Sequence, residues 1–118
     1  SCALPQSAVE RLPPERAAAL CGDPTAVIAD ARSPVRFAEG HIADAIHLPC
    51  SASGVAASDA FARLAGKRTV VVYGDTTEEA LAVAESLRRQ TALQSLRVVV
   101  LEGGFSAWSS AGLACSSG

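Results

Sequence analysis

The strongest nucleophiles in this sequence are its four cysteines, which are Cys2, Cys21, Cys50 and Cys115. No two of them form a CxxC pair, and the chain otherwise has the composition of a domain that needs no covalent cross-links, so we expect free thiols. Cys50 is the candidate for a reactive thiol because it closely follows a short apolar segment that predicts a strand. A cysteine in such a position also fits a small buried hydrophobic residue.

His41, His47 and Cys50 are close enough in sequence to be considered as zinc ligands. Their spacing, H-x5-H-x2-C, matches no standard zinc site, and His47 and Cys50 need not point to the same side of the chain. We therefore predict neither a metal site nor a cofactor. We expect His41 to lie in a turn after a short helix.

A polar loop between a strand and a helix is the place in this chain where α/β proteins put their chemistry. Residues 70–73 are apolar without polar alternation, which indicates a strand buried on both faces. Residues 80–89 carry an apolar stripe with helical spacing, and Thr76 and Glu79 have the spacing of a capping box. The loop between them consists of Gly74, Asp75, Thr76, Thr77, Glu78 and Glu79.

Other apolar runs alternate with helical segments along the chain. Further strands are predicted at residues 8–12, 26–29, 45–48 and 97–101, and further helices at 13–20, 34–39 and 58–64, with a last short helix around Trp108. Without a hairpin signal between them, this alternation indicates βαβ units and a parallel sheet with helices on both faces. We predict one α/β domain over residues 1–118, with tails at residues 1–7 and 112–118.

Composition excludes several classes of protein. The chain has 118 residues, of which 49% are hydrophobic and 19% charged, so it is long and apolar enough for one folded core. The net charge is −2 and no basic patch is interleaved with aromatic residues, so we expect no nucleic-acid partner. No apolar run approaches the roughly 20 residues of a membrane span. The lack of methionine indicates a processed protein or a piece of a longer one. We expect a cytoplasmic protein, with a periplasmic or exported one as the alternative.

Two motifs make the pattern more specific. Residues 30–32 (Asp-Ala-Arg) and 39–42 (Glu-Gly-His-Ile), followed by Ala45 and Pro49, resemble the first signature of the rhodanese homology domain. Residues 101–105 (Leu-Glu-Gly-Gly-Phe), followed by Trp108, are similar to its second signature. The resemblance covers nearly the whole chain. It implies a five-stranded parallel sheet with helices on both sides, and transfer of a sulfane sulfur through a cysteine persulfide.

The activity that the resemblance implies needs a cysteine at the start of the loop, where backbone N–H groups and the helix dipole lower the thiol pKa. Laid on this chain without gaps, the cysteine position is Gly74, and a later basic position falls on Glu79. The loop thus holds three acids, no base and no sulfur, and we expect no catalytic residue in it. A related phosphatase chemistry also needs a loop cysteine and arginine, so it fails for the same reason.

Electrostatics lead to the same expectation. An anion about 4 Å from one carboxylate meets about 1 kcal/mol of repulsion in water and up to about 4 kcal/mol at an effective dielectric of about 20. Glu78 and Glu79 suit the positive end of a helix dipole, so helix capping alone explains them. Arg32, at a strand end, is expected to be structural, with a role as a pocket residue as the alternative.

The sequence therefore predicts a rhodanese-like domain that does not transfer sulfur itself. We expect it to act as a binding, regulatory or structural module toward an unidentified protein partner or another domain of a longer chain. The alternative is a sulfurtransferase in which Cys50, or a cysteine from another domain, carries the sulfur.

Overall fold

A five-stranded parallel sheet forms the centre of the protein. The computed structural model describes residues 9–48, 64–89 and 96–116. The strand order is β1-β6-β5-β2-β4, and every neighbouring pair is parallel. The predicted α/β class and the five-stranded parallel sheet are confirmed. The strands are β1 (Glu10–Leu12), β2 (Ala26–Asp30), β4 (Ile46–His47), β5 (Thr69–Tyr73) and β6 (Arg97–Leu101).

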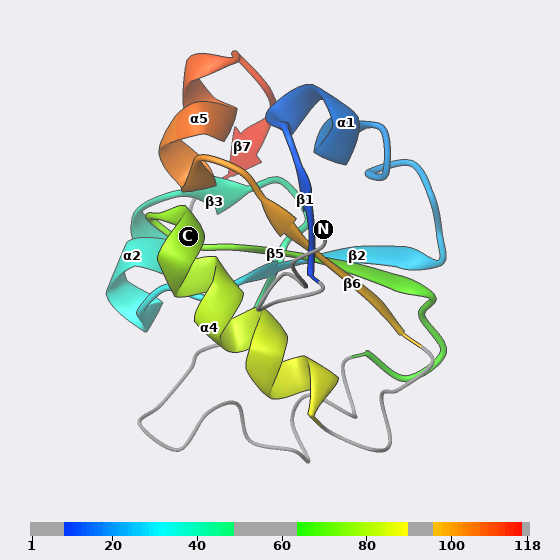
Figure 1. Cartoon of the computed structure of the whole chain (residues 1–118). Helices are drawn as coiled ribbons and strands as arrows, with labels where there is room; N and C mark the ends of the chain where they lie inside the picture. Colours follow the sequence, from blue (N-terminus) through cyan, green and yellow to red (C-terminus); the bar gives the residue numbers. More distant parts are fainter. Residues whose placement is uncertain (1–8, 49–63, 90–95, 117–118) are drawn as a thin grey trace, which may run out of the picture.

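Helices cover both faces of this sheet. Helix α4 (Thr77–Arg88) packs against β5 and β6 on one face, and α1 (Pro14–Ala18) and α5 (Gly104–Ser110) lie on the other (Figure 1). Helix α2 (Pro34–Glu39) follows β2 over the predicted range, with Ser33 as its N-cap. Among the residues that the structure describes, no helix is both long enough and apolar enough to cross a membrane.

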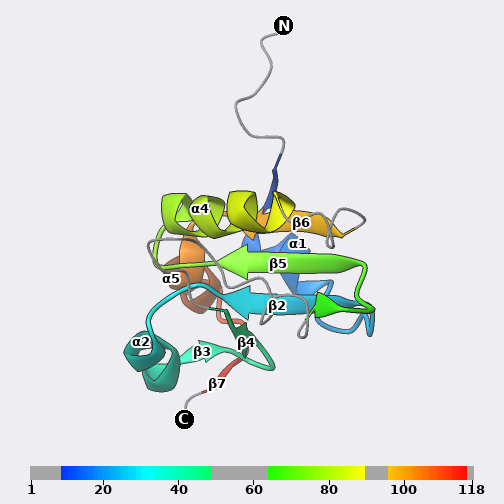
Figure 2. The ribbon, with the colours of Figure 1, turned by 90° about the horizontal axis from the view of Figure 1, so that it is seen from below.

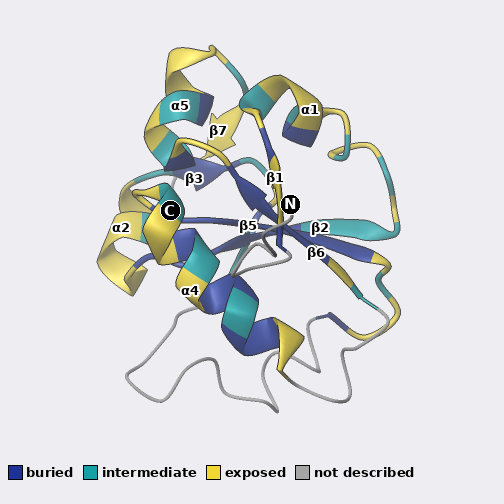
Figure 3. Ribbon diagram, viewed as in Figure 1, coloured by how far each residue is buried: buried dark blue, intermediate teal, exposed yellow. Residues whose placement is uncertain are grey.

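The two cores meet at β5, the middle strand of the sheet. All five of its residues are buried, and it pairs with β2 on one side and β6 on the other (Figure 3). Val70 and Val72 point to the α4 side, whereas Val71 and Tyr73 point to the side of α1 and α5. Each fully buried valine contributes about 1.5–3 kcal/mol through the area it removes from water. The predicted strands at 70–73 and 97–101 are confirmed.

Two short segments differ from the sequence-based expectation. Residues 41–42, predicted as a turn, form β3 (His41–Ile42), and part of the predicted tail at 112–118 forms β7 (Cys115–Ser116). These strands pair antiparallel beside β4, on the opposite side of the molecule from α4 (Figure 2). Ala114 fixes them, since its carbonyl accepts from the indole of Trp108 and from the backbone of Ala43. Two-residue strands show no periodicity, so only this tertiary contact reveals them.

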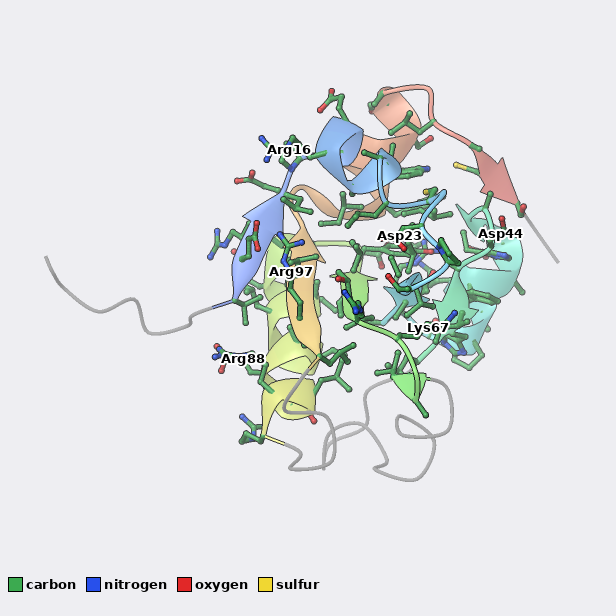
Figure 4. The ribbon with its side chains drawn as sticks, turned by 90° about the vertical axis from the view of Figure 1, so that its right-hand side faces the viewer. Arg16, Asp23, Asp44, Lys67, Arg88 and Arg97 are labelled. Carbon is green, nitrogen blue, oxygen red and sulfur yellow. The ribbon has the colours of Figure 1, made fainter. Side chains whose placement is uncertain are left out.

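Several predictions lie outside the described residues. These are the tail at 1–7, the first residue of the strand that was expected at 8–12, the loop after residue 50 and the helix at 58–64, of which only Leu64 is described. The rest of that expected strand contains β1. Leu64 is buried in the core on the α4 side. On the surface, charged residues of both signs are spread over one face, where Arg16, Lys67, Arg88 and Arg97 lie with Asp23 and Asp44 (Figure 4).

A buried network of charged and polar groups joins the carboxyl ends of the central strands. Asp30, the last residue of β2, is 0% exposed, and Arg32 is 3% exposed. Arg32 donates to Asp30 through Nη2 at 2.8 Å and through Nε, and it also donates to the carbonyl of Gly40. The Tyr73 hydroxyl donates to Asp30 at 2.6 Å and accepts from the backbone of Ile42 at 3.0 Å. The network therefore fixes β2, β5 and β3 relative to one another.

The start of α5 has room only for glycine. Gly104 has a φ of 71°, and a Cβ atom there would lie 2.7 Å from the carbonyl oxygens of both Gly74 and Asp75. The next residue, Phe105, donates its backbone N–H to the Gly74 carbonyl at 2.9 Å. The loop after β5 and the turn before α5 are thus in direct backbone contact.

Removing Asp30 should destabilise the fold strongly. In Asp30→Ala, Arg32 stays buried without its carboxylate, and we expect a loss of about 3–5 kcal/mol in the free energy of unfolding, measured in urea. Glu10→Ala is the control, because it removes an exposed ion pair with Arg97 of β6 (Figure 4), which is worth about 1 kcal/mol or less. Equal losses in the two variants would contradict a structural role for the buried pair.

Gly104→Ala should also destabilise the protein, because the new methyl group meets two carbonyl oxygens and the positive φ is strained. We expect a loss of about 1–3 kcal/mol from the strain, plus the displacement of the loop. Gly112→Ala is the matched control, since Gly112 has a φ of 76° but nothing within 4 Å of its Cβ position. Thermal melting of both variants separates the contact from the backbone strain, and a Gly112→Ala loss as large as that of Gly104→Ala would refute the contact.

Candidate functional site

The loop predicted to hold the chemistry lies where β5 ends and α4 begins. Thr76 is the N-cap of α4, and its hydroxyl accepts from the Glu79 backbone at 3.1 Å. The Glu79 carboxylate accepts from the Asp75 backbone at 2.7 Å, one residue before the donor of a standard capping box. Thr77 accepts from the backbone of Gly103 at 3.0 Å. Side chains of the loop thus accept from the N–H groups of Glu79 and Asp75.

Gly74 is buried at the start of the loop, and Glu79 fills the space beside it. A Cβ atom on Gly74 would lie 2.5 Å from Glu79 Oε1, 2.9 Å from Glu79 Cβ and 3.0 Å from Glu79 Cδ. These distances are shorter than van der Waals contact. Any side chain at position 74, including that of cysteine, therefore requires Glu79 to move and to release the Asp75 N–H.

Asp75 is not the uncompensated acid that the sequence analysis assumed. Its carboxylate accepts from Arg36 Nη2 at 2.8 Å and from Arg36 Nε at 3.2 Å, and Arg32 Nη1 lies 3.6 Å away. The hydrogen bonds from Arg36, opposed by slight burial and aided by the charges of both arginines, hold the pKa of Asp75 below its usual range. The contact is therefore present at neutral pH and is lost only as the pH falls through this lowered pKa.

A small pocket lies next to the two arginines. It has a volume of about 160 Å³ and is lined by Arg32, Arg36, Glu39, Gly40 and Phe105. The Arg32 guanidinium carbon lies 4.4 Å from the centroid of the Phe105 ring, in cation–π geometry. The pocket thus carries two positive charges, from Arg32 and Arg36, and one negative charge, from Glu39. The structure therefore places Arg32 in the pocket as well as in the buried network.

Sequence reasoning missed Arg36, although a signal for it was available. Arg36 follows Arg32 by four residues, and Ser33 and Pro34 start a helix between them. That geometry turns Arg36 toward the edge of the sheet at which β2 and β5 both end. A base directly beside the acidic loop could have been proposed from this spacing.

The remaining candidates do not join this site among the described residues. Cys50 lies outside the described residues. His41 Nδ1 is 2.8 Å from the Phe37 carbonyl and His47 Nε2 is 2.7 Å from the Arg32 carbonyl, so both nitrogens donate. Both imidazole rings stack on Phe37. No three metal-binding side chains gather within the described parts of the chain.

Two cysteines, Cys21 and Cys115, are free and exposed. Cys115 lies on β7, and Cys21 follows α1. Partial burial, together with the negative charge of Asp44, raises the pKa of Cys21. The reactive thiolate of Cys21 is therefore scarce at neutral pH.

Comparison with solved structures places this arrangement among known proteins. The chain is 27% identical to a thiosulfate sulfurtransferase from Pseudomonas aeruginosa, with a TM-score of 0.80. The match covers 100% of this chain but only 21% of that one. It is 25% identical to a rhodanese-like domain from Anabaena, with a TM-score of 0.75, over 91% of this chain and 78% of that one. A 3-mercaptopyruvate sulfotransferase from Escherichia coli, at 20% identity and a TM-score of 0.61, shares the fold over 93% of this chain and 52% of that one.

A search of curated proteins finds no match. The model of the rhodanese-like domain family, however, matches residues 13–111, which hold β2, β4, β5 and β6 of the sheet, the loop after β5 and the turn before α5. This match agrees with the sheet order and with both sequence motifs, and the chain therefore belongs to the rhodanese-like domain family.

Proposed function

We propose that this chain is a rhodanese-like domain that does not transfer sulfur through its own loop and that acts as a binding module. The observation that carries the proposal is at Gly74, where the family's cysteine would stand. Gly74 offers no nucleophile, and the space that a cysteine would occupy is filled by Glu79.

The surroundings of Gly74 also support the absence of persulfide chemistry. A persulfide in this loop would be stabilised by free backbone N–H groups and by the positive end of the α4 dipole. The Asp75 N–H already donates to Glu79, and the Glu79 N–H donates to Thr76. A negative sulfur would therefore compete with a carboxylate of the same charge for the same donor.

The part of the site that remains suits binding. Arg32, Arg36 and Phe105 line a pocket that a small anionic group could enter. The similar Pseudomonas protein is named as a thiosulfate sulfurtransferase, and only 21% of it corresponds to this chain, so a domain of this fold occurs there within a much longer chain. We infer that the partner here is another protein or another domain. Any catalytic groups then belong to that partner.

The isolated domain should lack thiosulfate sulfurtransferase turnover. With thiosulfate and cyanide as substrates, we expect thiocyanate formation no faster than with a heat-denatured sample, because the loop lacks a thiol. Turnover well above that background would contradict the proposal. In that case Cys50→Ser decides the source, since loss of turnover in this variant would identify Cys50 as the sulfur carrier.

Gly74→Cys alone should not create a reactive thiol. The new side chain collides with Glu79, and the carboxylate of Glu79 beside it raises the thiol pKa. We expect the iodoacetamide pH–rate profile, measured with the four native cysteines replaced by serine, to show a pKa no lower than the unperturbed value of about 8.5. Adding Glu79→Arg should lower that pKa and raise the rate, because it removes the acid that fills the space.

Glu78→Arg in the Gly74→Cys background is the matched control for this experiment. It makes the same change of charge one residue away and leaves Glu79 in place. We expect a much smaller gain in alkylation rate than with Glu79→Arg. If the single Gly74→Cys variant already reacts with a thiol pKa well below about 8.5, neither the acidic loop nor Glu79 is the barrier.

A further inference from the structure

A second pocket lies at the edge of the sheet opposite to the loop after β5. Because the strands are parallel, β2 and β5 begin at this edge and end at the edge that carries the candidate site. The second pocket has a volume of about 280 Å³ and is lined by the first residues of β2, by the turn before β4 and by Lys67, which precedes β5. It shares no lining residue with the smaller pocket beside Arg32 and Arg36.

Aliphatic side chains form one part of the wall of the second pocket. Leu20, which follows α1, and Ile28 of β2 pack in the core on the α1 and α5 side, whereas Val27 and Ile46 pack against the core on the α4 side. Leu20, Val27 and Ile46 are only partly buried, so an apolar ligand removes further surface from water. The volume lies just below the roughly 300–1,000 Å³ of sites for drug-sized ligands, so a smaller molecule fits.

Two groups of opposite charge line the pocket beside this aliphatic wall. They are Asp44, in the turn between β3 and β4, and Lys67, and both lie on the face that Figure 4 shows. None of the ion pairs within the described parts of the chain includes either residue. Lys67 Nζ donates to the Pro24 carbonyl at 3.1 Å, and an ammonium group has two further N–H donors. The pocket therefore offers one carboxylate and one ammonium group to a ligand.

We propose that the second pocket binds a small apolar zwitterion, a free aliphatic amino acid or a dipeptide, with its ammonium group toward Asp44 and its carboxylate toward Lys67. The aliphatic side chain of the ligand then lies against Leu20, Val27 and Ile46. A ligand with only one charge leaves one of the two protein charges partly desolvated without a partner, and this costs free energy. The site goes beyond the proposed function, because it lies away from the loop after β5.

The first test titrates L-leucine into the wild-type chain and follows the methyl groups of Ile28 and Ile46 by NMR. We expect saturation with a Kd of roughly millimolar order, given the ordinary binding energy per atom of a small ligand. Leucinamide lacks the carboxylate and N-acetyl-leucine lacks the ammonium group. Each should bind about fivefold more weakly, which corresponds to the loss of one ion pair at a partly exposed site. Glycine, which has no side chain, should not saturate the pocket.

Two variants assign the charges of the ligand to the two residues. Asp44 has a φ of 66°, a conformation that asparagine also adopts, so Asp44→Asn removes the charge and keeps the turn. It should weaken leucine about fivefold without weakening N-acetyl-leucine. Lys67→Met keeps an apolar stem, and it should weaken leucine without weakening leucinamide.

Asp23→Asn is the matched control for the two variants. It removes a charge from the same face but from outside the pocket lining (Figure 4). It should change the Kd for leucine less than about twofold at about 0.15 M salt, where distant surface charges are screened.

The cysteines supply a second readout within one molecule. Cys21 lines the pocket, whereas Cys115 lies on β7 and is equally open to alkylation. With leucine at about ten times its Kd, only about a tenth of the pocket stays empty. Alkylation of Cys21 by iodoacetamide, followed by mass spectrometry of its peptide, should therefore slow several-fold while Cys115 keeps its rate.

Leucyl-leucine in the same titration identifies the source of the zwitterion. Tighter binding of the dipeptide points to peptide ends, and tighter binding of leucine points to a free amino acid. Either result supports the site when both Asp44→Asn and Lys67→Met weaken binding.

Four results would overturn the proposal. Leucine could fail to saturate, either singly charged derivative could bind as tightly as leucine, Asp44→Asn or Lys67→Met could leave the Kd for leucine unchanged, or Cys21 could stay unprotected. The derivative series needs no variant, so it decides the question even if a substituted chain folds poorly. Thiosulfate turnover by the wild-type chain would end the proposed function without changing the outcome of these titrations.

Discussion

The ion pair between Asp30 and Arg32 is the constraint on which the rest of the site depends. Both side chains are almost fully buried, and a buried charge is tolerated only when its partner and its remaining hydrogen bonds are all in place. Asp30 therefore needs the Tyr73 hydroxyl, and Arg32 needs the Gly40 carbonyl. Meeting these needs brings the ends of β2 and β5 and the segment before β3 to one point. The sheet edge that carries the site is thus shaped by the requirement to satisfy one buried pair.

The same pair sets the electrostatics of the loop. Because Asp30 holds Arg32 in place, the far side of the guanidinium faces Phe105 and Asp75. Arg36, in the first turns of α2, adds a second positive charge on the same side. A loop with three acids and no base in its sequence is therefore balanced by two bases from an earlier part of the chain. The net charge of a site depends on all the elements that meet there. Counting the charged residues of one loop therefore does not give the charge of the site.

Much of the fold could be predicted because its signals are local. A few neighbouring residues are enough to recognise three of its features. These are the uninterrupted apolar run of β5, the N-caps Ser33 and Thr76, and the glycine pair at the start of α5. The pairing of β3 with β7 could not be predicted, since each strand has two residues and their partners lie more than 70 residues apart along the chain. The contact between Arg36 and Asp75 was missed for the same reason, because it joins residues 39 positions apart.

Gly74 and Glu79 form one structural unit, because the position of each depends on the other. An empty loop around a helix N-terminus leaves donors for a sulfur anion, whereas a loop capped by its own glutamate leaves none at Asp75. The glutamate can adopt this position only because residue 74 has no side chain, and the glycine is tolerated because the glutamate fills the space beside it. Thr76 and Glu79 together hold the start of α4 through the N–H groups of Glu79 and Asp75. The glycine at position 74 and the glutamate that caps the loop therefore depend on each other.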